Sequence, residues 1–356
     1  MSKVVMLVPS LEDKGPVIVA KDIALYDNKN EFIFISLRKN KAETLKKYIN
    51  FKVYELGLGK FPLISLKLKK LVEKINPNII HCHCFWPTIL AGIYLKKFRI
   101  ISTLHNNPLY DFYYEYGKIT SILMIKMMLF FQKNFYKNIA ISNYIKEVYE
   151  SLNLTNVETI YNGIPQIEIK KKTIKEVKKE KKIKLVTVSV LNRVKNVSFL
   201  LKVIEHLKNE EKNIELKIIG DGIEKSKLEK LVKEKNLQKE ILFLGKLKRE
   251  RVYEELQKSD IFLFSSLNEG FGLAVVEALL FNIPVIVSDI PVMKEIIKNN
   301  KNGIICNLSI EEYKNAVLKI YMNLDEFKEN TKRYFNKDFL AQNMSKNYAK
   351  IYEEKQ

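Results

Sequence analysis

Short apolar runs alternate with amphipathic helical segments along almost all of this 356-residue chain, and this alternation constrains the fold most. Several runs are continuously apolar, which is typical of parallel strands buried on both faces. Repeated strand–helix–strand units predict an α/β protein with doubly wound parallel sheets. The runs predict strands at residues 4–8, 32–36, 52–56, 78–82, 99–104, 138–141, 157–161, 183–190, 214–219, 241–244, 261–264, 284–288 and 303–306.

The length corresponds to about two domains, and a charge-dense stretch marks a boundary between them. Residues 166–182 contain eight lysines and three glutamates without a strand pattern, which favours a linker. We therefore predict a first Rossmann-like domain over 1–165, a second over 183–335 and a C-terminal helical tail over 336–356. Because ligands of open α/β sheets bind beyond the carboxyl ends of the strands, we expect the active site in a cleft between the domains.

The composition is that of a globular protein with surplus positive charge. Lysine and arginine number 61 against 41 acidic residues, a net charge of +20, and 47% of the residues are hydrophobic. This hydrophobicity excludes a disordered chain, and three cysteines are too few for a disulfide scaffold. The apolar run at 4–8 is too short for a signal peptide, and the run at 119–131 is too short for a membrane span. We therefore expect a reduced, cytoplasmic protein.

The segment 265–278, which reads SSLNEGFGLAVVEA, carries the most specific chemistry. It follows a predicted strand and opens a helix, and Gly270 and Gly272 allow the backbone to approach a ligand closely. Amide groups at such a helix start bind phosphate. Glu269 and Glu277 flank that start, where carboxylates accept hydrogen bonds from sugar and ribose hydroxyls. The pattern favours a nucleotide-sugar site; a glycine turn followed by a helix with two surface glutamates is the alternative.

The glutamate–seven residues–glutamate pattern resembles the family 4 retaining glycosyltransferases of the GT-B fold. Other segments resemble that family in the same order: NPNIIHCH at 76–83, STLH at 102–105, AIS at 140–142, IYNGI at 160–164, VSVLNRVKN at 188–196, IGDG at 219–222, FLG at 243–245, PVI at 284–286 and NG at 302–303. The resemblance covers about residues 1–335. It implies two Rossmann-like domains facing each other across a cleft, the first binding the acceptor and the second the nucleotide-sugar donor.

The resemblance also implies roles for individual residues. Lys195 matches the family's phosphate lysine, where a cation stabilises the leaving diphosphate. Glu269 and His105 match positions that contact the donor sugar, so these three are the predicted catalytic residues. Glu277 matches the ribose contact. The other predicted donor-binding positions are Gly15, Arg193, Leu247, Gly270, Phe271, Gly272 and Leu273.

The chain departs from the family pattern at three places. Ser189 and Val190 stand where the family has Gly-Arg before the lysine, so the phosphate arginine is not at its usual position. Arg193 either replaces that arginine or is exposed to solvent. The first loop reads Lys-Gly-Pro at 14–16 rather than paired glycines, and Asn282 replaces a glycine in a turn.

The cluster His81-Cys82-His83-Cys84 resembles a metal site in composition only. Strand alternation places the histidines on one side of the sheet and the cysteines on the other, which is poor geometry for tetrahedral ligation. We therefore predict no metal, and the family motifs require no cofactor beyond the nucleotide-sugar substrate. Nucleic-acid binding is not expected, because the chain has no recognisable nucleic-acid-binding motif.

The basic surplus has a further interpretation at residues 118–133, which are apolar with spaced lysines. Anionic lipids attract such lysines, so this segment is a candidate peripheral contact with the inner face of the plasma membrane. An ordinary buried helix before the strand at 138–141 is the other interpretation. In a combination of the two, the apolar face lies inside and the lysines outside.

The sequence therefore predicts a retaining hexosyl- or N-acetylhexosaminyl-type transferase. The donor is a UDP- or GDP-sugar, and the acceptor is a saccharide or a lipid-linked saccharide. Similar bacterial enzymes build capsule, O-antigen or lipopolysaccharide. Two alternatives are a non-catalytic GT-B subunit that binds nucleotide sugars and a GT-B sugar-nucleotide epimerase.

Overall fold

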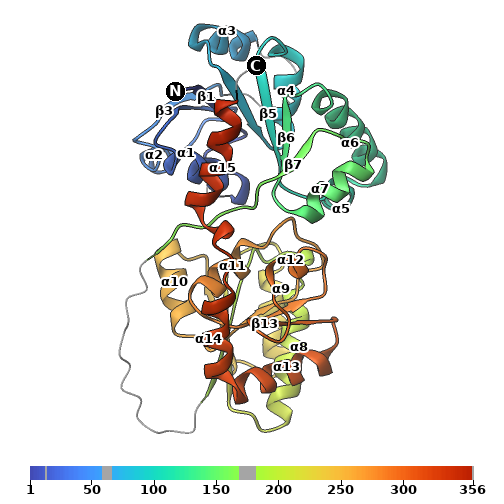
Figure 1. The fold of residues 1–356 in the computed structure, drawn as a ribbon. Helices are drawn as coiled ribbons and strands as arrows, with labels where there is room; N and C mark the ends of the chain where they lie inside the picture. Colours follow the sequence, from blue (N-terminus) through green and yellow to red (C-terminus); the bar gives the residue numbers. More distant parts are fainter. Residues whose placement is uncertain (13, 58–65, 168–181, 355–356) are drawn as a thin grey trace. The chain divides into compact units, whose positions relative to one another are not determined.

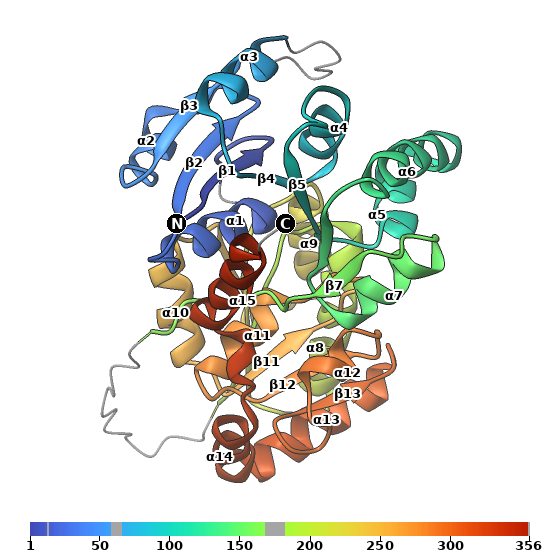
Figure 2. The same ribbon diagram turned by 45° about the horizontal axis from the view of Figure 1, so that its top comes forward.

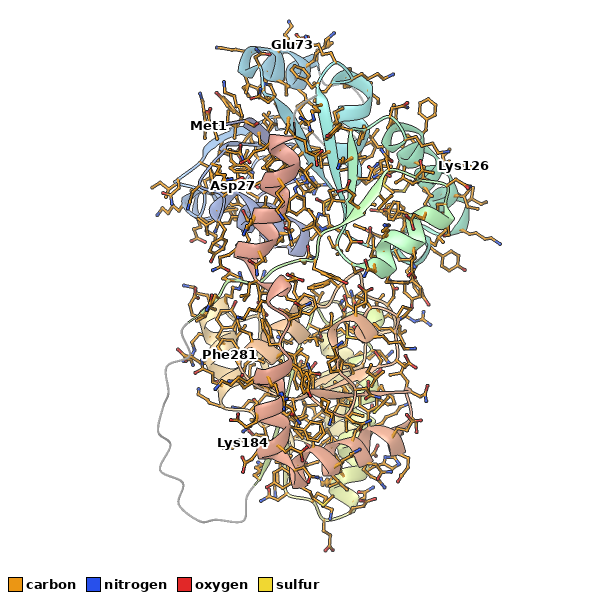
Figure 3. All side chains as sticks on the ribbon, viewed as in Figure 1. Met1, Asp27, Glu73, Lys126, Lys184 and Phe281 are labelled. Atoms are coloured by element: carbon orange, nitrogen blue, oxygen red, sulfur yellow. The ribbon has the colours of Figure 1, made fainter. Side chains whose placement is uncertain are left out.

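The computed structural model describes residues 1–12, 14–57, 66–167 and 182–354, which form two compact units. Figures 1 and 2 show their ribbons, and Figure 3 adds the side chains. The first unit comprises Met1–Gln166 and Lys337–Gln356, and the second comprises Ile167–Asn336. Most of the predicted linker, residues 168–181, lies outside the described residues.

The first unit is built on a parallel sheet of seven strands in the order β3-β2-β1-β4-β5-β6-β7. Strand β1 pairs with β2 on one side and β4 on the other, as in a doubly wound sheet. The strands are β1 (Lys3–Val8), β2 (Glu31–Ser36), β3 (Lys52–Glu55), β4 (Ile79–His83), β5 (Arg99–Leu104), β6 (Lys137–Ala140) and β7 (Val157–Thr159). The helices are α1 (Gly15–Leu25), α2 (Ala42–Lys46), α3 (Leu66–Ile75), α4 (Phe85–Tyr94), α5 (Pro108–Tyr116), α6 (Lys118–Gln132) and α7 (Asn143–Ser151).

The end of the chain completes the first unit. The 3-10 turn η2 (Lys337–Phe339) leads into α15 (Ala341–Glu353), which lies beside α1 (Figures 1 and 2). The Ser345 hydroxyl donates a 2.7 Å hydrogen bond to the carbonyl of Ile23 on α1. The Arg99 guanidinium donates to the carbonyl of Glu354 at 2.6 Å, which ties the end of α15 to β5.

The second unit contains a parallel sheet of six strands in the order β10-β9-β8-β11-β12-β13. The strands are β8 (Ile183–Val188), β9 (Ile214–Ile219), β10 (Ile241–Gly245), β11 (Ile261–Phe264), β12 (Val285–Ser288) and β13 (Gly303–Cys306). The helical elements are η1 (Arg193–Lys195), α8 (Val197–Asn209), α9 (Lys225–Glu234), α10 (Arg249–Gln257), α11 (Leu273–Leu280), α12 (Met293–Ile296), α13 (Ile310–Met322) and α14 (Leu324–Tyr334).

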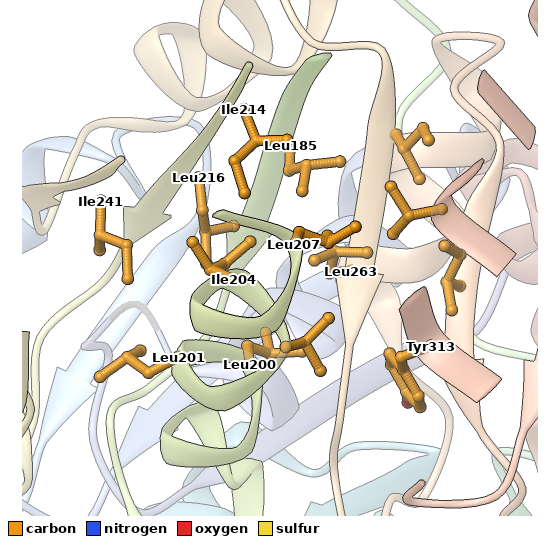
Figure 4. Close-up of a cluster of buried hydrophobic side chains, with 14 of the residues drawn as sticks. Leu185, Leu200, Leu201, Ile204, Leu207, Ile214, Leu216, Ile241, Leu263 and Tyr313 are labelled. Carbon is orange, nitrogen blue, oxygen red and sulfur yellow. The ribbon is translucent and has the colours of Figure 1, made fainter. Parts of the chain in front are cut away.

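Helix α8 shows how an amphipathic segment holds this sheet (Figure 4). Leu200, Ile204 and Leu207 recur at helical spacing and are fully buried. They join Leu185 and Leu216 of the sheet in one hydrophobic cluster. Burial of each such side chain contributes about 1.5–3 kcal/mol, so this face fixes α8 on the sheet.

All thirteen predicted strands are confirmed, most of them within one residue at either end. β8 ends at Val188, two residues before the predicted end, because the following residues bond to the loop after β9. The helix predicted before the strand at 138–141 is α6. Asn282 has a left-handed φ of 59°, which explains why glycine suits that turn.

Candidate functional site

The loop after β8 presents Lys195 at the end of the short turn η1. The Asn192 side chain caps this turn by accepting a hydrogen bond from the Lys195 amide at 3.1 Å. Asn196 then adopts a left-handed φ of 49°, which turns the chain into α8. Arg193 is exposed on the same turn, and its predicted phosphate contact stays a prediction.

The loop after β11 forms hydrogen bonds with the loop after β8. The Ser265 hydroxyl donates to the carbonyls of Lys195 at 3.1 Å and Asn196 at 3.0 Å. The Leu267 amide donates to the carbonyl of Val194 at 2.8 Å. Parallel strands β8 and β11 are neighbours in the sheet, so their carboxyl ends bring these loops together.

The side chains of Lys195 and Glu269 meet between these loops. Their ammonium and carboxylate groups form an ion pair, with side-chain exposures of 22% and 14%. The Ser266 hydroxyl donates to the same Glu269 oxygen, Oε1, at 3.1 Å. The structure therefore joins two predicted catalytic residues in one polar cluster, although 74 positions separate them in the sequence.

Helix α11 begins at Leu273, four residues after Glu269. Gly272 precedes its first residue with a φ of 100°, and a Cβ atom there would lie 2.7 Å from Cε of Met293. Only glycine fits this conformation and this space without strain. The first amides of a helix have no acceptor within the helix, so the start of α11 can bind an anion. Gly270 and Phe271 are buried in this turn, and Leu273 is half-buried.

The carboxylate of Glu277, one turn further along α11, has two partners from α10. Arg249 Nη2 lies 3.1 Å from Glu277 Oε1, and the Tyr253 hydroxyl donates to the same oxygen at 3.2 Å. Burial raises the pKa of Glu277 above its usual value, while Arg249 and Tyr253 lower it. Leu247 is half-buried in the loop that leads into α10.

Arg249 and Tyr253 are site residues that sequence reasoning missed. Their spacing of four places them on one face of α10, and Arg249 lies two residues after the predicted donor-binding position Leu247. That spacing is the one sequence pattern that links the two residues. It is common on surface helices, so it does not by itself indicate a ligand.

The loop after β8, in which Ser189 and Val190 replace the family's Gly-Arg pair, packs directly against the Gly-Asp-Gly segment after β9. A Cβ on Gly220 would lie 1.8 Å from the carbonyl oxygen of Ser189, and one on Gly222 would lie 2.2 Å from that of Leu191. The Leu191 amide donates to the carbonyl of Asp221 at 2.9 Å. The two glycines therefore allow direct backbone contact with this loop.

In the first unit, His105 follows β5 and belongs to a row of histidines. His105 Nε2 lies 2.9 Å from His83 Nδ1. His81 bonds through Nδ1 to the Tyr352 hydroxyl and through Nε2 to that of Thr103, both at 2.7 Å. Burial lowers the pKa of all three histidines, so they are neutral at pH 7. Contact of His105 with a donor sugar stays a prediction.

Gly15, the other predicted donor position in the first unit, is the first residue of α1. Among the residues that the structure describes, no heavy atom beyond the chain neighbours of Gly15 lies within 4 Å of a Cβ built on it. The backbone there is accessible, and its predicted contact with the donor stays a prediction.

The predicted alternation is confirmed for His81, Cys82 and His83, while Cys84 follows the end of β4 with a left-handed φ of 72°. The rings of His81 and His83 lie on one side of β4 with centroids 4.3 Å apart, whereas Cys82 packs in a hydrophobic cluster on the other side. Within the described parts of the chain, no three histidine, cysteine or acidic side chains are grouped so that they could hold a metal ion. In the same residues, no helix is long and apolar enough to cross a membrane.

Comparison with known proteins assigns the family. Residues 31–166 match the family Glycosyltransferase Family 4, and residues 168–338 match Glycosyl transferases group 1. The chain is 31% identical over 306 residues to an Escherichia coli protein named O-antigen biosynthesis glycosyltransferase WclY, covering 83% of this chain and 82% of that protein. The chain belongs to glycosyltransferase family 4. The resemblance stated from the motifs is therefore confirmed.

Other relatives extend the comparison of this glycosyltransferase. It is 25% identical to the N-acetyl-alpha-D-glucosaminyl L-malate synthase of Bacillus anthracis, over 84% of this chain and 82% of that protein. Its structure superposes on that of Anabaena Alr3699/HepE, crystallised with UDP and glucose, with a TM-score of 0.80. That match covers 100% of both chains at 16% identity. TarM matches with a TM-score of 0.79 at 14% identity over 99% of both chains. The predicted GT-B fold is confirmed.

Proposed function

We propose that this glycosyltransferase transfers a sugar from a nucleoside diphosphate to a saccharide or lipid-linked saccharide, with retention of anomeric configuration. The observation that carries the proposal is the Lys195–Glu269 ion pair next to the start of α11. Glu269 lies three residues before Gly272, which has a left-handed φ and directly precedes the helix. A cation, a carboxylate and a helix start within one pair of loops match the diphosphate and the hydroxyls of a nucleotide sugar.

Each group then has a role along the donor. Lys195 and the first amides of α11 bind the diphosphate, where negative charge grows as the bond to the sugar breaks. Glu269 accepts hydrogen bonds from hydroxyls of the sugar, and Glu277 accepts them from the ribose. Arg249 and Tyr253 hold the Glu277 carboxylate in position from α10.

The transfer proceeds on one face of the sugar. The bond from C1 to the diphosphate oxygen breaks, and its electron pair leaves with that oxygen. The acceptor hydroxyl oxygen forms the new bond to C1 from the same side, and its proton passes to the departing phosphate. This route needs no enzyme nucleophile, and Lys195 stabilises the charge on the leaving group throughout.

The substrate class is supported by relatives. A protein 31% identical to this chain is named for O-antigen biosynthesis, and another is named for an N-acetylglucosaminyl product. Solved structures of the same fold contain UDP with glucose, or UDP with GlcNAc. We therefore propose a UDP- or GDP-linked hexose or N-acetylhexosamine as donor. The corresponding pathway is synthesis of a bacterial surface polysaccharide: O-antigen, capsule or lipopolysaccharide.

The test is incubation with a panel of UDP- and GDP-sugars and saccharide acceptors, followed by NMR of the product. We expect one donor to give a product with the anomeric configuration of that donor. An inverted product would contradict the retaining mechanism. Nucleotide binding without turnover under any donor would indicate a non-catalytic subunit, and sugar-nucleotide conversion without acceptor would indicate an epimerase.

A further inference from the structure

Large apolar side chains are exposed on α5 and α6, which pack against each other in the first unit (Figure 2). Among the described residues, 18 large hydrophobic side chains are exposed, and eight of them lie between 109 and 130. We call these eight the α5–α6 surface: Leu109, Tyr113, Tyr114, Tyr116, Ile119, Ile122, Leu123 and Phe130. A large group of exposed apolar side chains on neighbouring helices points to a binding surface, whereas single exposed apolar residues are common.

The outer face of α6 is apolar because of helical geometry. At 100° per residue, Ile119, Leu123 and Phe130 lie within about 40° of one another. Their exposures are 86%, 67% and 66%. The residues that α6 buries lie on the opposite side of the helix, and they are Ser121, Ile125, Met128, Leu129 and Gln132. The expected apolar face packs inside with Ile125, Met128 and Leu129, and the outer side carries apolar side chains in addition to the expected lysines.

Lysines accompany the apolar residues on this face. Lys126 and Lys133 fall in the same sector as Phe130, and both are exposed; Figure 3 labels Lys126. Lys118 is exposed at the start of α6, and the helix contains no acidic residue. Long lysine side chains can extend past an apolar layer and keep the ammonium group in polar surroundings.

Helix α5 adds aromatic side chains to the same surface. Tyr113, Tyr114 and Tyr116 are each about half exposed. Tyrosine is enriched where apolar and aqueous phases meet, because the ring is apolar and the hydroxyl is polar. The acidic residues of α5 are Asp111, which is half-buried, and Glu115, which accepts a hydrogen bond from the Tyr116 hydroxyl at 2.9 Å.

From this geometry we propose that the α5–α6 surface binds the headgroup layer of an anionic lipid bilayer. The apolar side chains enter the boundary between headgroups and acyl chains, and the three lysines contact anionic headgroups. Each lysine near an anionic surface raises binding by about fivefold. A second copy of the chain fits less well, because α6 contains no acidic residue that could pair with Lys126 and Lys133 of a facing copy of the same helix.

The test is sedimentation with vesicles of phosphatidylglycerol and phosphatidylcholine, compared with vesicles of phosphatidylcholine alone. We expect binding to the anionic vesicles that weakens in 0.5 M salt. The double variant Leu123→Gln/Phe130→Gln should lower the partition coefficient at least about tenfold, because two side chains no longer enter the bilayer. Lys126→Gln/Lys133→Gln should lower it on anionic vesicles only.

The matched control is Ile223→Gln/Met322→Gln, which changes two exposed apolar residues of the second unit. It should bind as the unaltered chain does, and circular dichroism verifies that every variant is folded. Equal binding of all variants, or no binding to anionic vesicles, would overturn the proposal. A dimer detected by light scattering that Leu123→Gln/Phe130→Gln abolishes would show instead that this surface binds a second copy. The result does not depend on the donor or acceptor, so it is separable from the proposed transfer reaction.

Discussion

The ammonium group of Lys195 and the carboxylate of Glu269 form an ion pair across two loops of the second unit. Both side chains are mostly buried, and Ser266 donates a hydrogen bond to the same carboxylate oxygen. Within this pair, each charge neutralises the other. A nucleoside diphosphate would compete with Glu269 for Lys195, while hydroxyls of the sugar would take up hydrogen bonds to Glu269.

Replacing Lys195 with methionine should weaken nucleoside diphosphate binding about tenfold to hundredfold. A hydrogen bond to a charged group contributes about 1.5–3 kcal/mol, and methionine keeps the length of the side chain without the charge. Calorimetric titration of UDP and GDP measures the effect. Lys202→Met, which removes an exposed lysine from α8, is the control and should change the affinity less than twofold. Equal losses in both variants would show that general surface charge, not the Lys195 site, attracts the nucleotide.

The raised pKa of Glu277 predicts a specific pH dependence of donor binding. As the pH falls, the buried carboxylate takes up a proton at a pH above 4.5, the ordinary pKa of glutamate. The protonated group then accepts hydrogen bonds from the ribose hydroxyls less well. Nucleotide affinity should be measured from pH 8 to 5 for the unaltered chain and for Glu277→Gln, because their ratio cancels titration of the nucleotide phosphate. We expect this ratio to move toward one as the pH falls. A ratio constant over the whole range contradicts a ribose contact through ionised Glu277.

Gly220 in the Gly-Asp-Gly segment and Gly245 at the end of β10 provide a matched pair of glycine variants. In Gly245→Ala the new Cβ meets no heavy atom of the described residues within 4 Å, so the substitution introduces only the strain of a left-handed φ of 66°. It should lower the free energy of unfolding by about 1–2 kcal/mol. Gly220→Ala also drives a Cβ against the Ser189 carbonyl and should cost about 1–3 kcal/mol more. Chemical denaturation measures both free energies of unfolding. Equal costs would mean that the loop of Ser189 does not need close contact with Gly220.

Buried His81 predicts a loss of stability in acid. Its pKa is lowered to about 3 by burial, so below pH 6.5 the unfolded chain binds a proton that the folded chain does not. The free energy of unfolding therefore decreases as the pH falls from 6.5 toward 3. His81→Gln should reduce the slope between pH 5.5 and 4 by about 1.4 kcal/mol per pH unit. Denaturation curves at four pH values measure it, and an unchanged slope would show that His81 is protonated in the folded chain.

The sequence predicted the sheets well because parallel buried strands are continuous apolar runs with little ambiguity. It identified Glu269 and Lys195 through motifs, but their contact depends on the neighbouring positions of β8 and β11, which no local pattern contains. Arg249 was missed because its position on α10 resembles that of any surface arginine.

The sequence also did not predict which side of α6 packs against the rest of the protein. Apolar residues surround this helix on both sides, so the pattern does not show which side packs on the protein. Packing decides it: Phe131 lies against Gly92 of α4, where a Cβ would come within 2.4 Å of its ring. The helical tail, likewise, was predicted as a helix, while its packing beside α1 depends on contacts between opposite ends of the chain.

The most direct test of the account is the transfer rate of Glu269→Gln with the donor that the unaltered chain uses. Glutamine keeps the size of the side chain but removes the charge that pairs with Lys195. We predict a rate at least about a hundredfold lower in a variant that circular dichroism shows to be folded, while the exposed-surface control Glu329→Gln retains full activity. Undiminished transfer by Glu269→Gln would contradict the central claim that the Lys195–Glu269 cluster is the site of sugar transfer.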